Sequence, residues 1–501
     1  MAWRAETTCG AFGFGRCGWN GQLSSVTNAN GLVAEYAYDV MDRVTNIAWR
    51  TTAGASLGGF AYEYDAVGRI VARRHSLGDP SNPSQSSQKT YAYDIMDRLA
   101  SDGGVEYTYD AAGNRMTKTE NGEAVIYTLG EGDRLASYGR AASPLAACGG
   151  SYTYDAAGNV TQIVRDGSPT LDLVWNGQYQ LVSVSTNGVF AEGYAYDALG
   201  RRAATTTREG TTRHVYDDNW QVVADIDGEG NVLASYVWGE GIDRLLAVKL
   251  GGESYSSLTD VQGTVWGYVD SQNSIVARWQ YDAWGNVVDE EVSVPALATI
   301  RYRFQGREWS ASTGLVNFRM RWYDSVTGRW LSKDPIGLSG GMNLYAAWRN
   351  TPLLLWDPYG LVDMNLFSRD DVISNYADRH NPAGVFSVGA HGNAQDGVLY
   401  KKSDGKYYSI PVRSLARKIR RNPRYRHQPV QLDSCNVGNG QYPQQLANLL
   451  GVEVRAPTRF VWYSSTGVEY FGETATEAPN RDDPGELISF MPNRSNYIFL
   501  R

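Results

Sequence analysis

Aromatic residues alternate with small or polar residues in short runs up to Leu361, and most runs end in the same turn sequence. The unit is Tyr-x-Tyr-Asp-x-x-Gly-Asn/Arg. Alternation with a period of two predicts a strand with one buried face. Asp-x-x-Gly predicts a turn whose carboxylate accepts local N–H groups while glycine takes a positive φ. Copies of the unit begin at Tyr36, Tyr62, Tyr91, Tyr107, Tyr152 and Tyr194, and a weaker copy begins at Trp279.

A single hairpin of this kind cannot bury its aromatic face, so the copies must stack into one long sheet. The spacing of the copies is irregular, so we expect the extra residues between them to lie in loops. The composition agrees, because 33 Tyr, 15 Trp and 54 Gly against 12 Phe suit many strands joined by tight turns. The repeated Tyr and Asp residues are therefore predicted to be structural.

After Leu361 the pattern changes to strands that alternate with helices. "VFSVG" and "PVQLD" are short buried runs, and "RSLARKIRR" and "YPQQLANLLG" have helical spacing. This order predicts a mostly parallel sheet flanked by helices, in which functional residues gather at the carboxyl ends of the strands. The chain of 501 residues is thus expected to be multidomain, with a β-rich body and an α/β tail.

Charge and cysteine content narrow the functional classes. The net charge is −8, yet Lys and Arg outnumber Asp and Glu after Leu361, so the acidic excess lies before it. Four cysteines without a Cys-x-x-Cys pair indicate neither a disulfide framework nor a zinc site, and we expect no metal and no cofactor. No apolar run is long enough to span a membrane, and "MAWRAETTCG" lacks the apolar core of a signal peptide.

Residues 20–361 resemble the RHS/YD-repeat family. The repeats lead into a terminal block, "RYRFQGREW…LWDPYGL", which is similar to the RHS-associated core. The resemblance implies a spiralling antiparallel β-shell over residues 1–300, an associated core over 301–361 and a polymorphic toxin domain over 362–501. Family members usually carry more repeats before the core, so we expect a partial shell here.

The resemblance also implies that the shell cuts itself. In such shells the core ends in Asp-Pro-x-Gly-Leu, and an aspartic-protease-like reaction cuts the peptide bond that follows the Leu. The matching residues are Asp334 and Asp357 as acids and Arg321 as their partner, with the scissile bond between Leu361 and Val362. Two close carboxylates share one proton, so one acts as acid while the other activates water. Alternatively, both Asp-Pro pairs only open turns.

Two reactive side chains follow the buried strands of the tail. His391 comes after "VFSVGA" and Cys435 after "VQLDS". If these strands are neighbours, the imidazole can act as base and acid for a thiolate nucleophile. The order resembles the caspase-like cysteine peptidases, which implies a protein substrate in a target-cell cytosol and a role for Gly392 and Gly438 in backbone clearance or oxyanion binding. The alternative is a buried core cysteine and a loop histidine.

The segment from Arg413 to His427 is densely basic. Its residues Arg417, Lys418, Arg420 and Arg421 suit a phosphate or an activator, or they form a solvated helix face. Nucleic acid is the less favoured target, but a nucleic-acid-directed toxin is the first rival hypothesis. The second is a cell-surface interaction protein without enzymatic activity. A toxin of this family also implies a cognate immunity protein and a secretion or delivery apparatus.

Overall fold

The computed structural model describes residues 15–17 and 23–354, with breaks at 29, 42, 79–85, 141–148, 218–219, 240–242 and 336–341. Beyond residue 354 it describes 364–365, 386–389, 391–393, 397–401, 407–409, 412, 415–416, 419, 429–433, 441–450, 452–457, 460–463, 469–472 and 487–490. The chain divides into two compact units. Unit 1 holds residues 1–333 and 343–358, and unit 2 holds residues 334–342 and 359–501.

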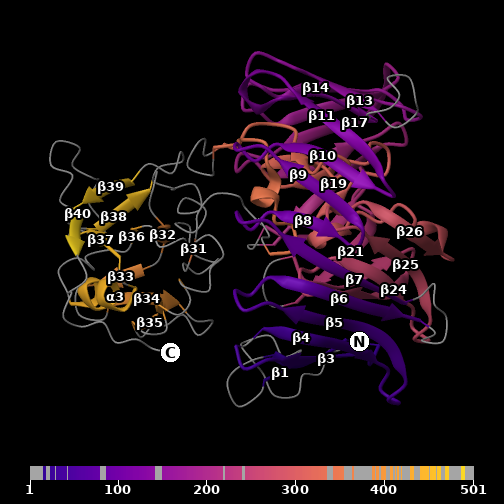
Figure 1. Ribbon diagram of the computed structural model, residues 1–501. Coiled ribbons are helices and arrows are strands. Elements are labelled where there is room, and N and C mark those ends of the chain that lie inside the picture. The colour runs from indigo at the N-terminus through magenta and orange to yellow at the C-terminus, as the bar shows by residue number, and fades with distance from the viewer. Residues whose placement is uncertain are drawn as a thin grey trace. The chain divides into compact units, whose positions relative to one another are not determined.

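Unit 1 is built on one 26-stranded sheet in which each strand pairs antiparallel with the next strand of the chain. Figure 1 shows this succession of neighbours, and the predicted large antiparallel sheet is confirmed. The strands are β1 Gly15–Cys17, β2 Leu23–Thr27, β3 Val33–Tyr38, β4 Val44–Arg50, β5 Ser56–Tyr64, β6 Ile70–Leu77, β7 Ser86–Tyr93, β8 Leu99–Asp102, β9 Val105–Tyr109, β10 Arg115–Glu120, β11 Glu123–Leu129, β12 Leu135–Arg140, β13 Gly150–Tyr154, β14 Val160–Arg165, β15 Leu171–Trp175, β16 Leu181–Thr186, β17 Val189–Tyr196, β18 Arg202–Thr206, β19 Thr211–Tyr216, β20 Val222–Ile226, β21 Val232–Trp238, β22 Leu245–Leu250, β23 Glu253–Thr259, β24 Val265–Val269, β25 Ile275–Tyr281 and β26 Val287–Val292.

The repeat turn has the predicted geometry. In the turn between β5 and β6, Asp65 Oδ1 accepts the backbone N–H groups of Val67 at 3.1 Å and Arg69 at 2.9 Å. Gly68 has a φ of +95°, in the region that glycine enters without strain. A degenerate copy keeps this conformation with Asp97, whose φ is 63°. The backbone conformation of the turn therefore persists where its glycine does not.

The two tyrosines of each repeat have different roles. The first, such as Tyr62, is buried inside the sheet. The hydroxyl of the second donates to a carbonyl of the preceding strand, as Tyr64 does to Val44 at 2.6 Å and Tyr93 does to Ile70 at 2.7 Å. One tyrosine thus supplies apolar area, and the other joins its strand to the previous one.

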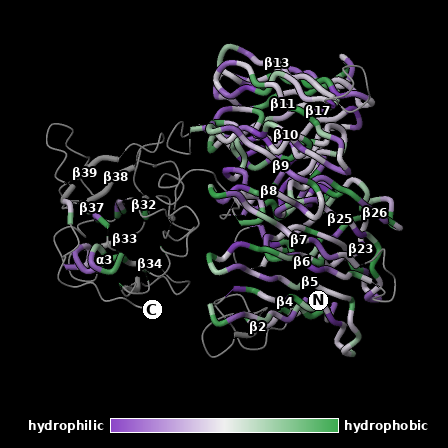
Figure 2. Tube along the Cα trace, in the orientation of Figure 1, coloured by the Kyte–Doolittle hydropathy of each residue, from purple (hydrophilic) through white to green (hydrophobic). Residues whose placement is uncertain are grey.

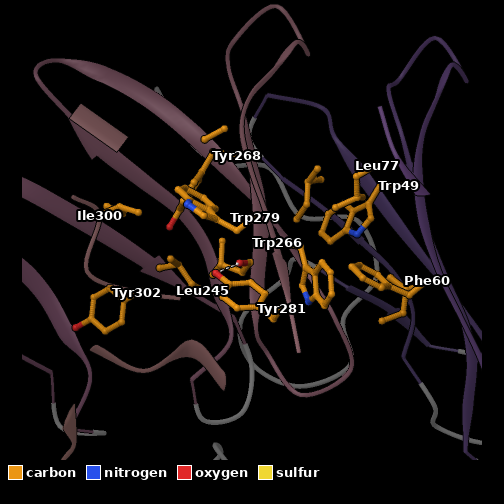
Figure 3. Close-up of a cluster of buried hydrophobic side chains, with 14 of the residues drawn as sticks. Trp49, Phe60, Leu77, Leu245, Trp266, Tyr268, Trp279, Tyr281, Ile300 and Tyr302 are labelled. Carbon is orange, nitrogen blue, oxygen red and sulfur yellow. Dashed lines mark hydrogen bonds between the residues drawn. The ribbon is translucent and has the colours of Figure 1, made fainter. Parts of the chain in front are cut away.

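The inner faces of the early and late strands share one hydrophobic cluster. Trp266 of β24 meets Phe60 of β5 with a ring-centroid distance of 5.4 Å and Tyr281 of β25 at 5.3 Å. Figure 3 shows Trp266 lying between these two rings. Hydrophobic and hydrophilic residues intermix along these strands, as expected when only one face is buried (Figure 2).

Residues 301–354, here called the core block, pack against the middle of the sheet. Leu315, Trp322 and Leu331 of the block join the cluster formed by the inner faces of β11 to β17. The Trp322 ring lies 4.8 Å from that of Tyr194. The block consists of η4 Phe304–Gly306, β27 Glu308–Trp309, β28 Val316–Phe318, β29 Arg321–Asp324, β30 Arg329–Trp330 and η6 Ala347–Asn350, preceded by η3 Pro295–Leu297. An irregular segment therefore covers the aromatic face of a regular sheet.

Buried charges also join the core block to the sheet. Glu308 pairs with Arg202 of β18, and Arg301 Nη2 lies 3.0 Å from Asp225 Oδ1 of β20. Burial acts to raise the pKa of Glu308, but Arg202 and Arg301 outweigh it and hold that pKa well below its usual range. His214 Nδ1 lies 2.7 Å from the same Asp225 oxygen. Removing one member of such a cluster leaves an uncompensated buried charge, at a cost of about 3–5 kcal/mol.

Unit 2 contains a five-stranded sheet in the order β31-β32-β36-β37-β40. The first three pairings are parallel and the last is antiparallel. Helix α3 Tyr442–Leu450 buries Leu446 in the same cluster as Val388 and Leu432. The caspase-like sheet flanked by helices stays a prediction. The described strands of unit 2, in this sheet and in the smaller sheets β33-β34-β35 and β38-β39, are β31 Met364–Asn365, β32 Phe386–Gly389, β33 His391–Asn393, β34 Gly397–Lys401, β35 Tyr407–Ser409, β36 Val430–Asp433, β37 Val454–Pro457, β38 Phe460–Tyr463, β39 Glu469–Gly472 and β40 Leu487–Phe490.

Replacing Trp266 by alanine is expected to lower the free energy of unfolding of unit 1 by about 3–5 kcal/mol. The change leaves a cavity between Phe60 and Tyr281 and removes the indole donor that lies 3.0 Å from Asp260. Urea denaturation followed by tryptophan fluorescence measures it. Val288→Ala on β26, at a side chain that is 58% exposed, is the control and should cost less than about 0.5 kcal/mol. Equal losses for both variants would contradict the buried position of Trp266.

Acidification should destabilise unit 1 between about pH 6.5 and pH 4. Burial and Arg301 lower the pKa of His214 to about 4, and burial and Arg73 lower the pKa of His75 to about 3. The unfolded chain binds protons at these histidines over that interval and the folded chain does not, so a lower pH favours unfolding by about 2 kcal/mol per histidine at pH 5. Thermal melts from pH 7 to pH 5 should show a smaller fall for His214→Gln than for the wild type. An unchanged pH dependence in His214→Gln would contradict the assignment.

Candidate functional site

Part of the predicted self-cleavage site lies within the described residues. Arg321 begins β29, is 5% exposed, and its guanidinium carbon lies 4.2 Å from the centre of the Trp330 ring. Asp334 is half-buried and follows β30 by a few residues. Asp357, Leu361 and Val362 lie outside the described residues. The self-cleavage assignment therefore stays a prediction, but the segments that lead to both aspartates can be followed.

The core-block residues that come before and after the segment 334–342, here called the excursion, lie side by side. The backbone N–H of Trp330 donates to the carbonyl of Tyr345 at 3.0 Å, and Arg329 and Ala346 form an isolated antiparallel bridge. The two ends of the excursion are therefore joined by backbone hydrogen bonds. Asp334 lies just beyond this closed base.

Two turns of the repeat sheet hold the base of the excursion. Val160 N–H, at the end of the turn Asp155–Asn159, donates to the carbonyl of Leu331 at 2.8 Å. The hydroxyl of Tyr345 donates to the carbonyl of Gly158 in the same turn at 2.7 Å. One repeat turn thus contacts the chain both before and after the excursion.

The turn Asp110–Asn114 makes the second set of contacts. Asn114 Oδ1 accepts hydrogen bonds from Asn343 Nδ2 at 2.6 Å and from Arg329 Nη1 at 3.1 Å. Arg329 also donates to the backbone carbonyl of Asp133. Burial lowers the pKa of the Arg329 guanidinium, because it disfavours the charged form. The hydrogen bonds to these neutral acceptors compensate part of the cost of burying the charge.

The segment that leads to Asp357 is held in a similar way. The carbonyl of Pro352 accepts from Gln262 Nε2 at 2.7 Å and from Gln305 Nε2 at 3.3 Å. Asn350 Nδ2 donates to the carbonyl of Gly113 at 2.7 Å. The backbone of the core block is therefore bonded to the sheet up to Pro352, two residues before the last described residue ahead of "WDPYGL".

The two strands that precede the predicted thiol-site residues are neighbours in unit 2. β32 and β36 pair in parallel, with Gly389 opposite Asp433. His391 is the second residue after Gly389 and begins β33, where it pairs with Leu399 of β34. Cys435 is the second residue after Asp433 in the sequence and, like Gly438, lies outside the described residues. Gly392 pairs with Val398 in the same hairpin.

The basic segment has only its apolar positions within the described residues. Leu415 and Ile419 are fully buried in the cluster that contains Val388 and α3. Arg417, Lys418, Arg420 and Arg421 lie outside the described residues, and a phosphate or activator site there stays a prediction. The apolar spacing agrees with one buried face of a helix.

The repeat turns that hold the core block were not singled out as functional from the sequence. Two of the asparagines that close repeat turns bond to the core block: Asn114 Oδ1 accepts from Asn343 Nδ2 at 2.6 Å, and Asn286 Nδ2 donates to the carbonyl of Ser325 at 2.9 Å. Turns that close with arginine, such as Arg69 and Arg98, bond instead to the neighbouring repeat. These turn residues were visible in the sequence, but which of them meet the core block required the tertiary structure.

The described part of the chain shows no group of three or more His, Cys, Asp or Glu side chains arranged to hold a metal ion. Among the described helices, none is both long and apolar enough to cross a membrane.

Residues 20–345 match the family model described as Teneurin YD-shell, and residues 362–471 match a model described as a domain of unknown function. The tRNA3(Ser)-specific nuclease WapA of Bacillus spizizenii is 32% identical over 208 residues, which are 39% of this chain and 9% of that protein. The double-stranded DNA deaminase toxin A of Burkholderia cenocepacia is 28% identical over 342 residues, 62% of this chain and 21% of that protein.

Among solved structures, the crystal structure of TcdB2-TccC3-TEV matches with a TM-score of 0.55 and 22% identity, over 68% of this chain and 19% of the solved chain. That likeness supports the fold alone. The chain spans only a small part of the length of each of these proteins. The family model covers well over half of the chain, and the repeats, turns and sheet agree with it, so the chain belongs to the Teneurin YD-shell family, the RHS-type shells of polymorphic toxins.

Proposed function

We propose that this protein is a polymorphic toxin that cuts itself between Leu361 and Val362 and thereby frees residues 362–501 as an effector. The observation that carries the proposal is the attachment of the core block to the repeat turns on both sides of Asp334 and up to Pro352. Such attachment gives fixed starting points to the two Asp-Pro-x-Gly-Leu segments. The second family match also begins at residue 362, which supports a domain boundary there.

The proposed cleavage is a hydrolysis by two carboxylates. One of Asp334 and Asp357 is ionised and takes a proton from water, which attacks the carbonyl carbon of Leu361. The other is protonated and donates to the carbonyl oxygen. The C–N bond then breaks, and the Val362 nitrogen leaves as an amine after it gains a proton. Arg321 would stabilise the ionised carboxylate.

The proposed effector activity is that of a cysteine peptidase or a related thiol hydrolase. The parallel pairing of β32 with β36 supports it, because His391 and Cys435 follow equivalent ends of neighbouring strands. His391 would act as base and acid for the Cys435 thiolate. Gly392 and Gly438 would give the substrate backbone room and supply N–H groups to an oxyanion. A caspase-like fold remains part of this proposal.

A second candidate is a nucleic-acid-directed effector. Two relatives carry the names of a tRNA nuclease and a double-stranded DNA deaminase toxin. In this case Arg417, Lys418, Arg420 and Arg421 would contact phosphates, and Cys435 would be structural. Both candidates imply delivery into a target cell and a cognate immunity protein in the producer.

The intact mass of the purified full chain tests self-cleavage. We expect two fragments that separate after Leu361 in the wild type, and one uncut chain in Asp334→Asn and in Asp357→Asn, because an amide cannot share the catalytic proton. Asp289→Asn, at an exposed position on β26, is the control and should be cut like the wild type. A full-length mass for the wild type would contradict the proposal.

Expression of residues 362–501 in a bacterial cytosol distinguishes the two effector candidates. The thiol mechanism predicts growth arrest that Cys435→Ala and His391→Ala each abolish, a loss of at least about a hundredfold in killing. Ser434→Ala, the neighbouring small polar residue, should stay toxic. If Cys435→Ala kills as the wild type does while a combined Arg417→Gln and Arg421→Gln variant does not, the nucleic-acid-directed candidate takes its place.

A further inference from the structure

Two of the chemical forms of the repeat turn, one closed by arginine and one closed by asparagine, can be compared directly. The arginine form links one repeat to the next. Arg69 Nε donates to Asp65 Oδ2 of its own turn at 2.6 Å, and Nη1 donates to Asp97 Oδ1 of the next turn at 2.9 Å. The same guanidinium lies 4.9 Å from the centre of the Tyr93 ring. The long side chain therefore covers the space beside its own turn.

The asparagine form keeps the internal bond and leaves that space to another segment. Asn114 Nδ2 donates to Asp110 Oδ2 at 3.0 Å, which replaces the arginine Nε bond. It also donates to Asp133 Oδ1 at 2.7 Å. The short amide ends there, and its Oδ1 accepts from Arg329 and Asn343 of the core block.

Asn114 uses its whole hydrogen-bonding capacity in this arrangement. Its Nδ2 has two acceptors, and its Oδ1 accepts from Arg329 and Asn343. The residue is 2% exposed, so a lost partner is not replaced by bulk water. Arg329 precedes the Asp334 excursion and Asn343 follows it, so one side chain holds both ends of the segment.

We propose that Asn114 is a positioning residue for self-cleavage, which sets the location of the Asp334 segment by binding Arg329 and Asn343 together. This inference rests on the proposed cleavage after Leu361. Asn114 does not touch the reacting atoms. It fixes the base from which the carboxylate reaches them, and an error of about 1 Å in such placement can cost about a hundredfold in rate.

Replacing Asn114 by arginine separates docking from folding of the turn. Arginine closes the equivalent turns at Arg43, Arg69, Arg98 and Arg201, with Nε bonds of 2.6 to 2.7 Å to the turn aspartate, so the turn itself accepts it. At position 114, however, arginine has no acceptor for Asn343, and it sets a second positive charge beside Arg329. The substitution therefore disturbs the docking contact specifically.

Asn231→Arg is the matched control. The turn Asp227–Asn231 has the same internal bonds, with Asn231 N–H and Nδ2 each 2.8 Å from the Asp227 carboxylate, but Asn231 is exposed. We expect full-length Asn231→Arg to cut itself at the wild-type rate. Asn114→Arg should cut about a hundredfold more slowly, as followed by intact mass against time.

The pH profile of the remaining cleavage distinguishes positioning from a general loss of folded protein. Two close carboxylates split their pKa values, and cleavage proceeds between the two values. If Asn114→Arg moves the Asp334 and Asp357 carboxylates apart, their two pKa values converge. The pH range over which self-cleavage proceeds then becomes narrower. A variant that only lowers the folded fraction would scale the profile without narrowing it, and that result would overturn the proposal.

Gly158→Ala provides an independent test should Asn114→Arg fail to fold. A Cβ at Gly158 would lie 2.5 Å from the Tyr345 hydroxyl and 2.6 Å from Lys333 Cε, on the other turn that holds the excursion. Gly230→Ala carries the same backbone strain, since φ is +91° against +97°, but has no atom within 4 Å of the added Cβ. Slow cleavage with a narrowed pH range only in Gly158→Ala supports positioning by the turns, and equal rates in both variants overturn it.

The outcomes also separate this inference from the proposed function. An uncut wild type would overturn self-cleavage and the positioning role together. A wild type that is cut, with Asn114→Arg folded and cut at the same rate, would overturn the positioning role alone.

Discussion

The aromatic face of the repeat sheet has to be removed from water, and the rest of unit 1 follows from this requirement. Each repeat adds a buried tyrosine, and no hairpin can cover its own. The sheet meets the requirement in two ways. Its early and late strands pack on one another around Trp266, and its middle strands pack on Trp322 of the core block. The core block is thus an integral part of the interior.

Covering a regular sheet with an irregular segment creates a second problem, because the segment brings backbone groups and charges with it. The repeat turns and strands supply the partners. Glu308 and Arg301 find charges on β18 and β20, while Arg329 and Pro352 find amides and carbonyls at turns. Repeat turns therefore serve both as links to the next repeat, as at Arg69, and as docking points for the core block, as at Asn114.

The proposed functions use the two units differently. In unit 1 the proposed chemistry depends on contacts between the sheet and the core-block residues that flank Asp334 in the sequence. In unit 2 it depends on the register of two parallel strands, since Gly389 lies opposite Asp433. Register is set by backbone hydrogen bonds and resists single substitutions, whereas docking by one buried amide does not. Substitutions at docking turns are therefore a sharper probe of the shell than substitutions within its strands.

The strand, the turn and their repetition can be predicted from local patterns, because alternation of Tyr with polar residues and the Asp-x-x-Gly turn need no distant partner. Short apolar runs likewise indicated the sheet in the tail. The turns that meet the core block, the binding of Arg329 and Asn343 by Asn114, and the pairing of the strands before His391 and Cys435 became known from the three-dimensional structure. Those contacts join residues far apart in the chain, and a local pattern carries no information on which distant segment fills the space beside it.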